Sequence, residues 1–311
     1  MKKFNIQLIG FLGILFGIIC LFQIVYSNKP YTALDIFYNE SILKLHKRSD
    51  KVKVIFLGDS FGYYGINPKN SNTKVSYFNY CFPSEPIFNI YYKFKYLLEK
   101  TNIVPKRIYI IGNAQMFLID RAKFNFKLND KRFLLHYQSD FFWNLDFKNK
   151  ASYIFNNFDI FRLGKRKYIK DTYNEYQNEF GTGIRNYQID SITEQDIKEY
   201  TITRKDINRY YSPEVLDYYK KLDKLCIENK IDLRFYIMPT AYVFSERIKN
   251  YFKYEADAAS FLKSQFPHRH NINLAKADLL ITDFSDRGHL NKKGSEKLFR
   301  YFRILDRDLL D

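Results

Sequence analysis

The stretch VIFLGDSFGYYGINP, residues 54–68, decides the fold class of this chain. Val54–Leu57 are apolar and partly β-branched, which is typical of a strand buried on both faces of a parallel sheet. Gly58 and Asp59 end the apolar run, so we expect Ser60 where the chain leaves the strand. Open α/β sheets bind their ligands at that end of a strand. Ser60 is therefore a candidate nucleophile, although Gly, Asp and Ser also favour turns through local hydrogen bonds.

Strands and helices are expected to alternate through the rest of the chain. The expected strands are Val52–Leu57, Val75–Tyr80, Arg107–Ile111 and Leu233–Met238, and the expected helices are Glu85–Lys100, one capped by Ser212 that starts at Pro213, and Lys292–Leu305. This alternation predicts an α/β fold with three layers, in which a flavodoxin-like parallel sheet is flanked by helices. No phosphate-binding glycine motif is present, so a nucleotide site is not expected.

The section from about 120 to 211 does not fit the alternation. It is aromatic and mixed in charge, and FGTGI at 180–184 interrupts it. We interpret it as an insertion between the third and fourth strands, either a lid or a substrate-facing subdomain. The domain that carries the sheet is expected to span residues 51–311, with this insertion inside it.

Residues 1–26 are expected to form a transmembrane anchor, and residues 27–50 a tether. No charged residue lies between Phe4 and Tyr26, and a helix of this length reaches about 34 Å, enough to cross a hydrocarbon core of about 30 Å. A cleaved signal peptide is the alternative, but its apolar core is usually shorter and an A-x-A-like site would follow. Because Lys2 and Lys3 precede the segment, we expect a single-pass cell-membrane protein with a cytoplasmic N-terminus and a periplasmic or extracellular domain.

The chain is basic, with a formal net charge of +16 from 50 Lys and Arg against 34 Asp and Glu. This balance favours an anionic lipid surface or an acidic glycan as partner. A coding bias toward Lys, Asn, Ile, Tyr and Phe would produce the same balance without a partner. No compact Lys/Arg run accompanies a nucleic-acid motif, so nucleic acid is not an expected partner.

Cysteine and histidine usage predicts neither a metal site nor a cofactor. Cys81 and Cys226 lie outside the expected anchor and could form one disulfide in an oxidising compartment, but no C-x-x-C is present. His268 and His270 have an alternate spacing, but no nearby Cys or acidic residue completes a ligand set, so both are expected to be solvated.

A second informative stretch is DFSDRGHLNKKGSEKL, residues 283–298, which precedes and enters the last expected helix. Asp286 and His289 stand three residues apart in a loop that contains glycine. A serine hydroxyl becomes a good nucleophile when a base, usually His, takes its proton, and a carboxylate holds and stabilises that base. Asp283 is the alternative carboxylate.

G-D-S after the first strand, together with D-x-x-H-L-N-x-x-G before the last helix, resembles the SGNH/GDSL hydrolase superfamily. The resemblance covers Val54–Pro68 and Asp283–Gly294. It implies that Ser60 is the nucleophile and that Asp286 and His289 complete a catalytic triad.

The middle motifs of that family match less well. The family usually supplies oxyanion donors from the amide of the serine itself, from a glycine after the second strand and from an asparagine after the third. Here Ser84 stands near the place of the glycine, and Asn113 in IGNAQ matches the asparagine. Asn113 could equally be a turn residue, and Ser84 could cap the helix expected from about Glu85.

The expected anchor, the exported domain and the G-D-S-x-x-x-x-G-I-N-P opening resemble membrane-tethered SGNH proteins of bacterial envelopes. This resemblance implies serine-dependent acyl ester chemistry, either ester hydrolysis or O-acetyl transfer, on an acylated surface polysaccharide. It also implies a membrane acyltransferase as a further partner. A scaffold subunit of an envelope acylation complex that has lost turnover is one alternative. A glycan-binding module, supported by the many aromatic residues, is another.

Overall fold

The computed structural model describes residues 2–26, 41–47, 52–68, 75–101, 103–113, 137–144, 147–148, 150–151, 181–199, 213–244, 251–269, 271–272 and 279–309. The chain divides into two compact units. The smaller consists of Met1–Glu40 and Asn125–Asn174, and the larger of Ser41–Phe124 and Glu175–Asp311. Most of the expected insertion at 120–211 lies outside the described residues, and so do Ser212 and His270.

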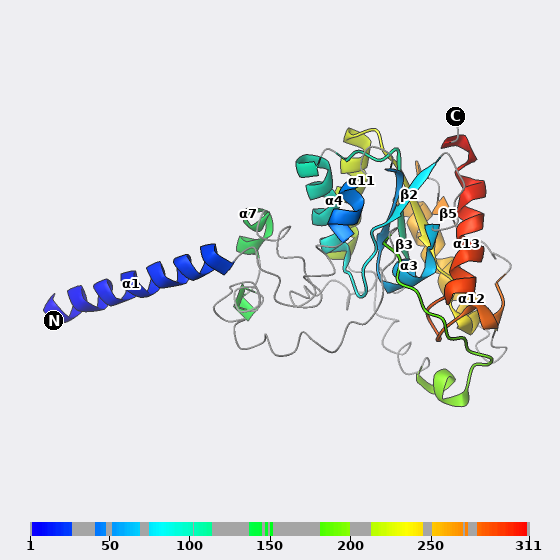
Figure 1. Ribbon diagram of the computed structural model, residues 1–311, viewed down its shortest axis with the longest axis horizontal. Helices are drawn as coiled ribbons and strands as arrows, with labels where there is room; N and C mark the ends of the chain where they lie inside the picture. The colour runs from blue at the N-terminus through cyan, green and yellow to red at the C-terminus, as the bar shows by residue number, and fades with distance from the viewer. Residues whose placement is uncertain are drawn as a thin grey trace. The chain divides into compact units, whose positions relative to one another are not determined.

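Within the described residues, the larger unit contains a parallel sheet of five strands in the order β2-β1-β3-β4-β5 (Figure 1). The strands are β1 Val52–Gly58, β2 Ser76–Asn79, β3 Arg107–Gly112, β4 Asp232–Ile237 and β5 Asn271–Ile272. All four pairings between neighbouring strands are parallel. The predicted α/β fold with a parallel sheet is confirmed, and β5 is an addition that the sequence did not predict.

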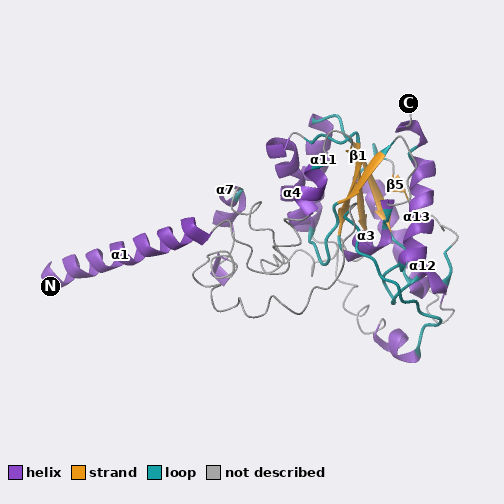
Figure 2. Cartoon of the chain, in the orientation of Figure 1, coloured by secondary structure: helices purple, strands orange, loops and turns teal. Residues whose placement is uncertain are grey.

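Helices cover both faces of this sheet (Figure 2). They are α3 Ser60–Gly65, α4 Ile87–Thr101, α11 Pro213–Glu228, α12 Tyr251–Gln265 and α13 Lys292–Leu305. On one face α4 and α11 lie side by side, and the rings of Phe88 and Tyr218 meet with centroids 5.2 Å apart. On the other face Phe302 of α13 packs on Phe56 of β1 and Tyr109 of β3, at 5.2 and 4.9 Å.

Strand β1 lies between β2 and β3, and its apolar run is buried as the sequence predicts. The side chains of Val54, Ile55, Phe56 and Leu57 are fully buried. At the end of the strand Gly58 pairs with Ile111 of β3, and a Cβ at position 58 would lie 1.9 Å from the Ile111 carbonyl oxygen. Any larger residue would therefore push β1 and β3 apart at the edge where the chain turns into α3.

The smaller unit contains α1 Lys2–Tyr26, α7 Gln138–Phe141 and the 3-10 helix η3 Phe142–Asn144. Helix α1 covers the segment in which the sequence predicts an anchor. Among the described residues, no helix is both long and apolar enough to span a membrane. The anchor therefore stays a prediction from the sequence. Of the expected tether at 27–50, residues 27–40 and 48–50 lie outside the described residues, and 41–46 are helical.

A buried ionic cluster ties the C-terminal segment to the amino end of the sheet. Arg107, the first residue of β3, is 3% exposed and contacts Asp232, Asp306 and Asp308 at 2.7, 2.5 and 2.5 Å. Asp306 is fully buried and also accepts the hydroxyl of Tyr109 at 2.5 Å, whereas the side chain of Asp308 is 56% exposed. The two carboxylates from the C-terminal segment thus share one partner but differ in burial.

The difference in burial predicts that Asp306 contributes more to the free energy of unfolding than Asp308 does. Asp306→Ala leaves the buried Arg107 guanidinium with less compensation, and we expect a loss of about 3 kcal/mol in the free energy of unfolding. Asp308→Ala removes an exposed partner of the same guanidinium and should cost less than about 1 kcal/mol. Urea unfolding of the purified chain measures both values. Equal losses in the two variants would contradict the importance of burial.

Candidate active site

Ser60 lies at the carboxyl edge of the sheet, as the first residue of α3. Asp59 caps this helix, because its side chain accepts the backbone N–H of Phe61 at 3.0 Å. The Asp59 carboxylate is itself buried, and its carbonyl accepts the amide of Tyr63 at 3.0 Å. Asp59 therefore fixes the turn from β1 into α3 and sets the position of Ser60.

The loop that precedes α13 is closed by its own hydrogen bonds. Phe284 and Leu290 form an antiparallel bridge, and the amide of Ser285 donates to the His289 carbonyl at 2.8 Å. Asn291 ends the loop and caps α13 by accepting the amide of Gly294 at 3.0 Å. The residues between the two sides of the bridge are thus held in one turn.

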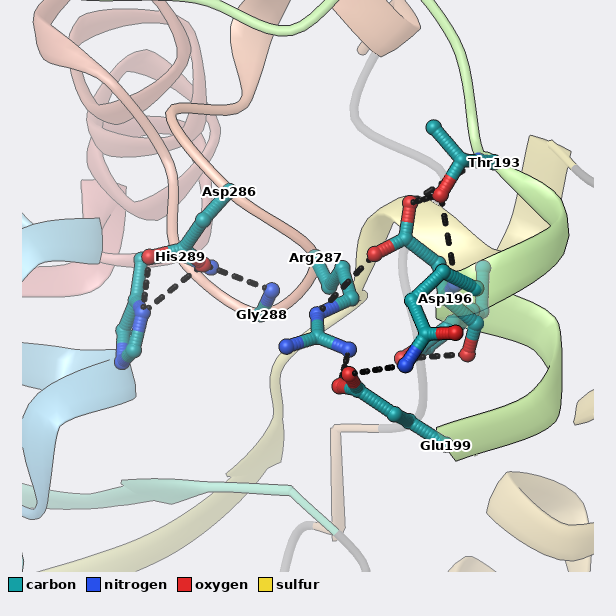
Figure 3. Close-up of polar contacts among 9 residues, drawn as sticks. Thr193, Asp196, Glu199, Asp286, Arg287, Gly288 and His289 are labelled. Carbon is teal, nitrogen blue, oxygen red and sulfur yellow. Dashed lines mark hydrogen bonds and ion pairs between the residues drawn. The ribbon is translucent and has the colours of Figure 1, made fainter. Parts of the chain in front are cut away.

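The three residues of the expected triad lie together, although Ser60 and His289 are 229 positions apart in the chain. His289 Nε2 is 2.8 Å from Ser60 Oγ. On the other side of the ring, His289 Nδ1 is 2.9 Å from both carboxylate oxygens of Asp286. Figure 3 shows the Asp286 carboxylate facing the imidazole within the loop. The geometry permits proton transfer from the hydroxyl to an imidazole whose orientation a carboxylate holds.

The surroundings of Asp286 keep its carboxylate ionised. Burial raises the pKa of Asp286, but the hydrogen bond and charge of His289 and the amides of Gly288 and His289 lower it more, so the pKa lies well below the usual range. Each of the two amides donates to Oδ1 at 2.8 Å. The carboxylate therefore carries its charge at neutral pH and is available to stabilise an imidazolium.

Two aromatic side chains of α3 hold the plane of the imidazole. Phe61 stacks on the His289 ring and Tyr64 meets it edge-on, each with ring centroids 5.2 Å apart. Phe61 and Tyr64 stand three residues apart, which places them on the same side of the helix. Since Ser60 precedes them on α3, one short helix positions both the hydroxyl and the base.

A segment from the end of the expected insertion packs over α3 and the loop, and we call residues 181–189 the strap. Thr182 Oγ1 donates to the Ile66 carbonyl at 2.6 Å, and the amide of Gly183 donates to the Tyr63 carbonyl at 3.2 Å. A Cβ at Gly183 would lie 2.1 Å from the Tyr63 ring. Gly183 thus permits a close approach to α3.

The strap brings a charged residue, Arg185, to the site. Its guanidinium donates to Asp286 Oδ2 and lies over the ring of Tyr64, with 3.9 Å between the guanidinium carbon and the ring centroid. Arg185 was not predicted as a site residue from the sequence. The only local signal was the glycine pair just before it, which marks a close backbone approach without indicating the surface approached.

The loop is also tied to the helical segment 194–199, as Figure 3 shows. Arg287 forms ion pairs with Glu199 and, at 3.3 Å, with Asp196. Asp196 in turn accepts the amide and hydroxyl of Thr193 at 2.8 and 2.7 Å. Arg287 therefore faces away from the imidazole, toward this helical segment.

The two candidate oxyanion residues have different surroundings. Asn113 is buried and directly follows β3, and the pairing of Gly58 with Ile111 places it at the same sheet edge as Ser60. Ser84 is exposed, and its φ of +58° is a conformation that favours glycine. The alternative, in which Ser84 caps a helix that starts near Glu85, does not fit, because α4 begins at Ile87. The oxyanion roles of both residues stay predictions.

The contacts of the alternative carboxylate, Asp283, are those of a residue that stabilises the fold. It is fully buried and accepts the ammonium of Lys297 at 2.6 Å and the amide of Leu280 at 2.7 Å. These bonds join the loop to α13 beneath the site. In the structure Asp286 and not Asp283 contacts His289.

The remaining histidine and cysteine candidates lie elsewhere. His268 was expected to be solvated, but its half-exposed ring contacts Asp223 at 2.9 Å, and Asp223 also binds Arg269. Cys81 and Cys226 are buried free thiols, and burial raises the pKa of each. Within the described residues, no group of three His, Cys, Asp or Glu side chains could hold a metal ion.

This chain is similar to the solved structures of two bacterial proteins. A Bacteroides fragilis protein provisionally assigned as an acylhydrolase is 11% identical, with a TM-score of 0.41, over 88% of this chain and 98% of its own. A GDSL-like lipase from Bacteroides thetaiotaomicron is 10% identical, with a TM-score of 0.38, over 88% of this chain and 99% of its own. No protein-family model and no curated protein matches the sequence. The chemistry of the site is inferred from its own geometry.

Reaction of Ser60 with a fluorophosphonate probe distinguishes the two carboxylates of the loop. Asp286→Asn removes the partner of His289, and we expect the labelling rate to fall by roughly 10²–10⁴-fold. Asp283→Asn should lower thermal stability through the lost Lys297 contact but leave the labelling rate of the folded protein unchanged. Labelling is measured at a temperature at which circular dichroism shows that both variants are folded. Equal rates in the two variants would contradict the assignment of Asp286.

Proposed function

We propose that this protein carries out serine-dependent acyl ester chemistry of the SGNH/GDSL type. The observation that supports it is the hydrogen-bonded series from Ser60 Oγ through His289 to the Asp286 carboxylate, with distances of 2.8 and 2.9 Å. A structural role for the three residues would not require a serine hydroxyl to lie against the free nitrogen of a carboxylate-bound imidazole. That arrangement is the one that activates a hydroxyl.

In the proposed reaction Ser60 Oγ attacks the carbonyl carbon of an ester while His289 Nε2 takes the hydroxyl proton. The C–O bond to the alcohol then breaks, and His289 returns the proton to the leaving oxygen. This leaves an acyl group on Ser60 and a neutral imidazole. Water or a sugar hydroxyl next attacks the acyl carbonyl, again with His289 as base. The bond from the acyl carbon to Ser60 Oγ then breaks, the carboxylic acid or the new sugar ester leaves, and His289 returns the proton to Ser60.

The tetrahedral intermediate of each step carries a negative oxygen that needs donors. The amide of Ser60 itself and the side chain of Asn113 are the donors that the family resemblance implies. The burial of Asn113 and its place at the Ser60 edge of the sheet support this role. Losing one such donor typically lowers the rate by about 10²–10³-fold.

We propose an acylated surface polysaccharide as the substrate, with the chain at the cell membrane. The net charge of +16, the uncharged segment from Phe4 to Tyr26 and the resemblance to envelope SGNH proteins support this assignment. Hydrolysis and acyl transfer share every step up to the acylated serine, and they differ in whether water or a sugar hydroxyl reaches it. A membrane acyltransferase that donates or accepts the acyl group is the proposed partner.

A scaffold without turnover is the second candidate, because the exposed Ser84 departs from the middle motifs of the family. A scaffold has no need for an activated serine. Absence of both ester hydrolysis and fluorophosphonate labelling in the folded wild type would favour it. Labelling without hydrolysis would favour a strict transferase.

The test of the proposed function is hydrolysis of small activated acetyl esters by the purified chain. Ser60→Ala should abolish it, and His289→Ala should cost about as much, because the two residues act as a unit. Asn113→Ala should lower kcat by about 10²–10³-fold. Asn229→Ala is the matched control for Asn113→Ala, because the side-chain amide of Asn229 donates to the Leu225 carbonyl at the end of α11. Full activity in a folded Ser60→Ala protein would refute the proposal.

A further inference from the structure

Arg185 contacts both members of the Asp286–His289 pair. Its guanidinium donates to Asp286 Oδ2, and the same nitrogen lies 3.4 Å from His289 Nδ1. The side chain is only 17% exposed, and Tyr64 covers one face of the guanidinium. A cation thus lies beside the imidazole in a partly buried site, where its charge is weakly screened.

The backbone of the strap fixes the place of this cation. The amide of Gly183 is bonded to the Tyr63 carbonyl on α3, and the carbonyl of Arg185 accepts the amide of Lys292, the first residue of α13, at 2.8 Å. Further along, the amide of Ile189 donates to the Phe284 carbonyl at 3.0 Å. The strap is therefore anchored to α3, which carries Ser60, and at both ends of the loop that carries Asp286 and His289.

The charges on the two sides of the imidazole act in opposite directions. The Asp286 carboxylate favours the imidazolium form, whereas a guanidinium next to Nδ1 disfavours a second positive charge. The Arg185 guanidinium also donates to the Asp286 carboxylate, so less of the negative charge of that carboxylate is available to the imidazole. Asp286 holds the ring and its charge favours protonation, and the Arg185 guanidinium offsets part of that effect while the carboxylate still holds the ring.

We propose that Arg185 is a positioning residue that fixes the Asp286 carboxylate against His289 and keeps the imidazole neutral to a lower pH than the Asp–His pair alone would. The proposal rests on the acyl chemistry proposed above, because it concerns the base of that reaction. Within the reaction, a neutral His289 is the form that accepts the proton of Ser60. Arg185 would therefore extend activity toward acidic pH.

In the described part of the chain, the other side chains that contact the imidazole are a serine and two aromatic residues. From α3 the ring meets Ser60, Phe61 and Tyr64. Among the described residues, the charged side chains that contact the ring are Asp286, from its own loop, and Arg185, from the strap.

The matched control is a second arginine that holds the same loop. Arg287 joins the loop to the segment 194–199 through Asp196 and Glu199 and makes its contacts away from the ring (Figure 3). Arg185→Met and Arg287→Met each remove one guanidinium that ties the loop to residues 181–199, which belong to the expected insertion. Only the first removes a charge beside His289.

The experiment compares the pH dependence of kcat/KM for an activated acetyl ester. In Arg185→Met we expect the acid limb to move to higher pH by roughly one unit, with about a tenfold loss at a pH on that limb. Arg185→Lys keeps the charge and should keep the acid limb near that of the wild type. Arg185→Lys should still lower the plateau value of kcat/KM, because lysine lacks the planar guanidinium that donates to Asp286 and stacks on Tyr64.

Arg287→Met should lower thermal stability but leave the acid limb where it is in the wild type. An equal shift in Arg185→Met and Arg287→Met would show that loosening of the loop causes it, and would overturn the proposal. An unchanged acid limb in Arg185→Met would overturn it as well.

A readout that needs no turnover separates this proposal from the proposed function. The imidazole signal of His289 can be followed by NMR across the pH range and assigned among the five histidines by its loss in His289→Asn. A titration that moves to higher pH in Arg185→Met supports the role of Arg185 even if no ester is cleaved. Coincident titrations in the wild type and Arg185→Met refute that role, whatever the activity.

Discussion

The negative charge of Asp286 is shared by donors from two segments of the chain, and the arrangement of the site depends on that sharing. The amides of Gly288 and His289 and the imidazole come from its own loop, and the guanidinium of Arg185 comes from 101 residues earlier. A partly buried carboxylate is costly unless its bonds are satisfied. The folded loop and the docked strap therefore support each other at the carboxylate that holds His289.

The nucleophile depends on a different constraint, the close packing of β1 against β3. Because Gly58 has no Cβ, the two strands stay paired up to the edge where the chain turns, and Asp59 caps the helix that follows. Ser60 then starts α3, whose next residues stack on His289. At the opposite edge, the Arg107 cluster holds the C-terminal segment against the start of β3. The two polar systems thus lie at the two ends of a largely apolar sheet.

Sequence reasoning predicted the parts of the fold that have local signals. The buried run of β1, the start of α11 at Pro213 and the bounds of α13 follow from apolar periodicity and end signals. Ser60, Asp286 and His289 were identified because each lies in a short motif at the end of an element. Their contact follows from the parallel sheet, which brings the carboxyl ends of its strands to one edge.

The features that were missed depend on tertiary contacts. Arg185 lies in a segment with no regular periodicity, and only its docking on α3 gives it a role. The two residues of β5 are too few for a pattern, and the pairing of His268 with Asp223 joins residues 45 positions apart. Ser84 could not be placed from local preference, because Ser favours both a helix cap and a turn.

The proposed chemistry requires that Ser60 becomes acylated. The most direct measurement is mass spectrometry of peptides from the full chain after a rapid acid quench of its reaction with an activated acetyl ester. We expect one acetyl group on the peptide that contains Ser60, formed during the first turnover and absent from Ser60→Ala. An acetyl group on a different residue, or release of the alcohol without any acetylated Ser60, would contradict it.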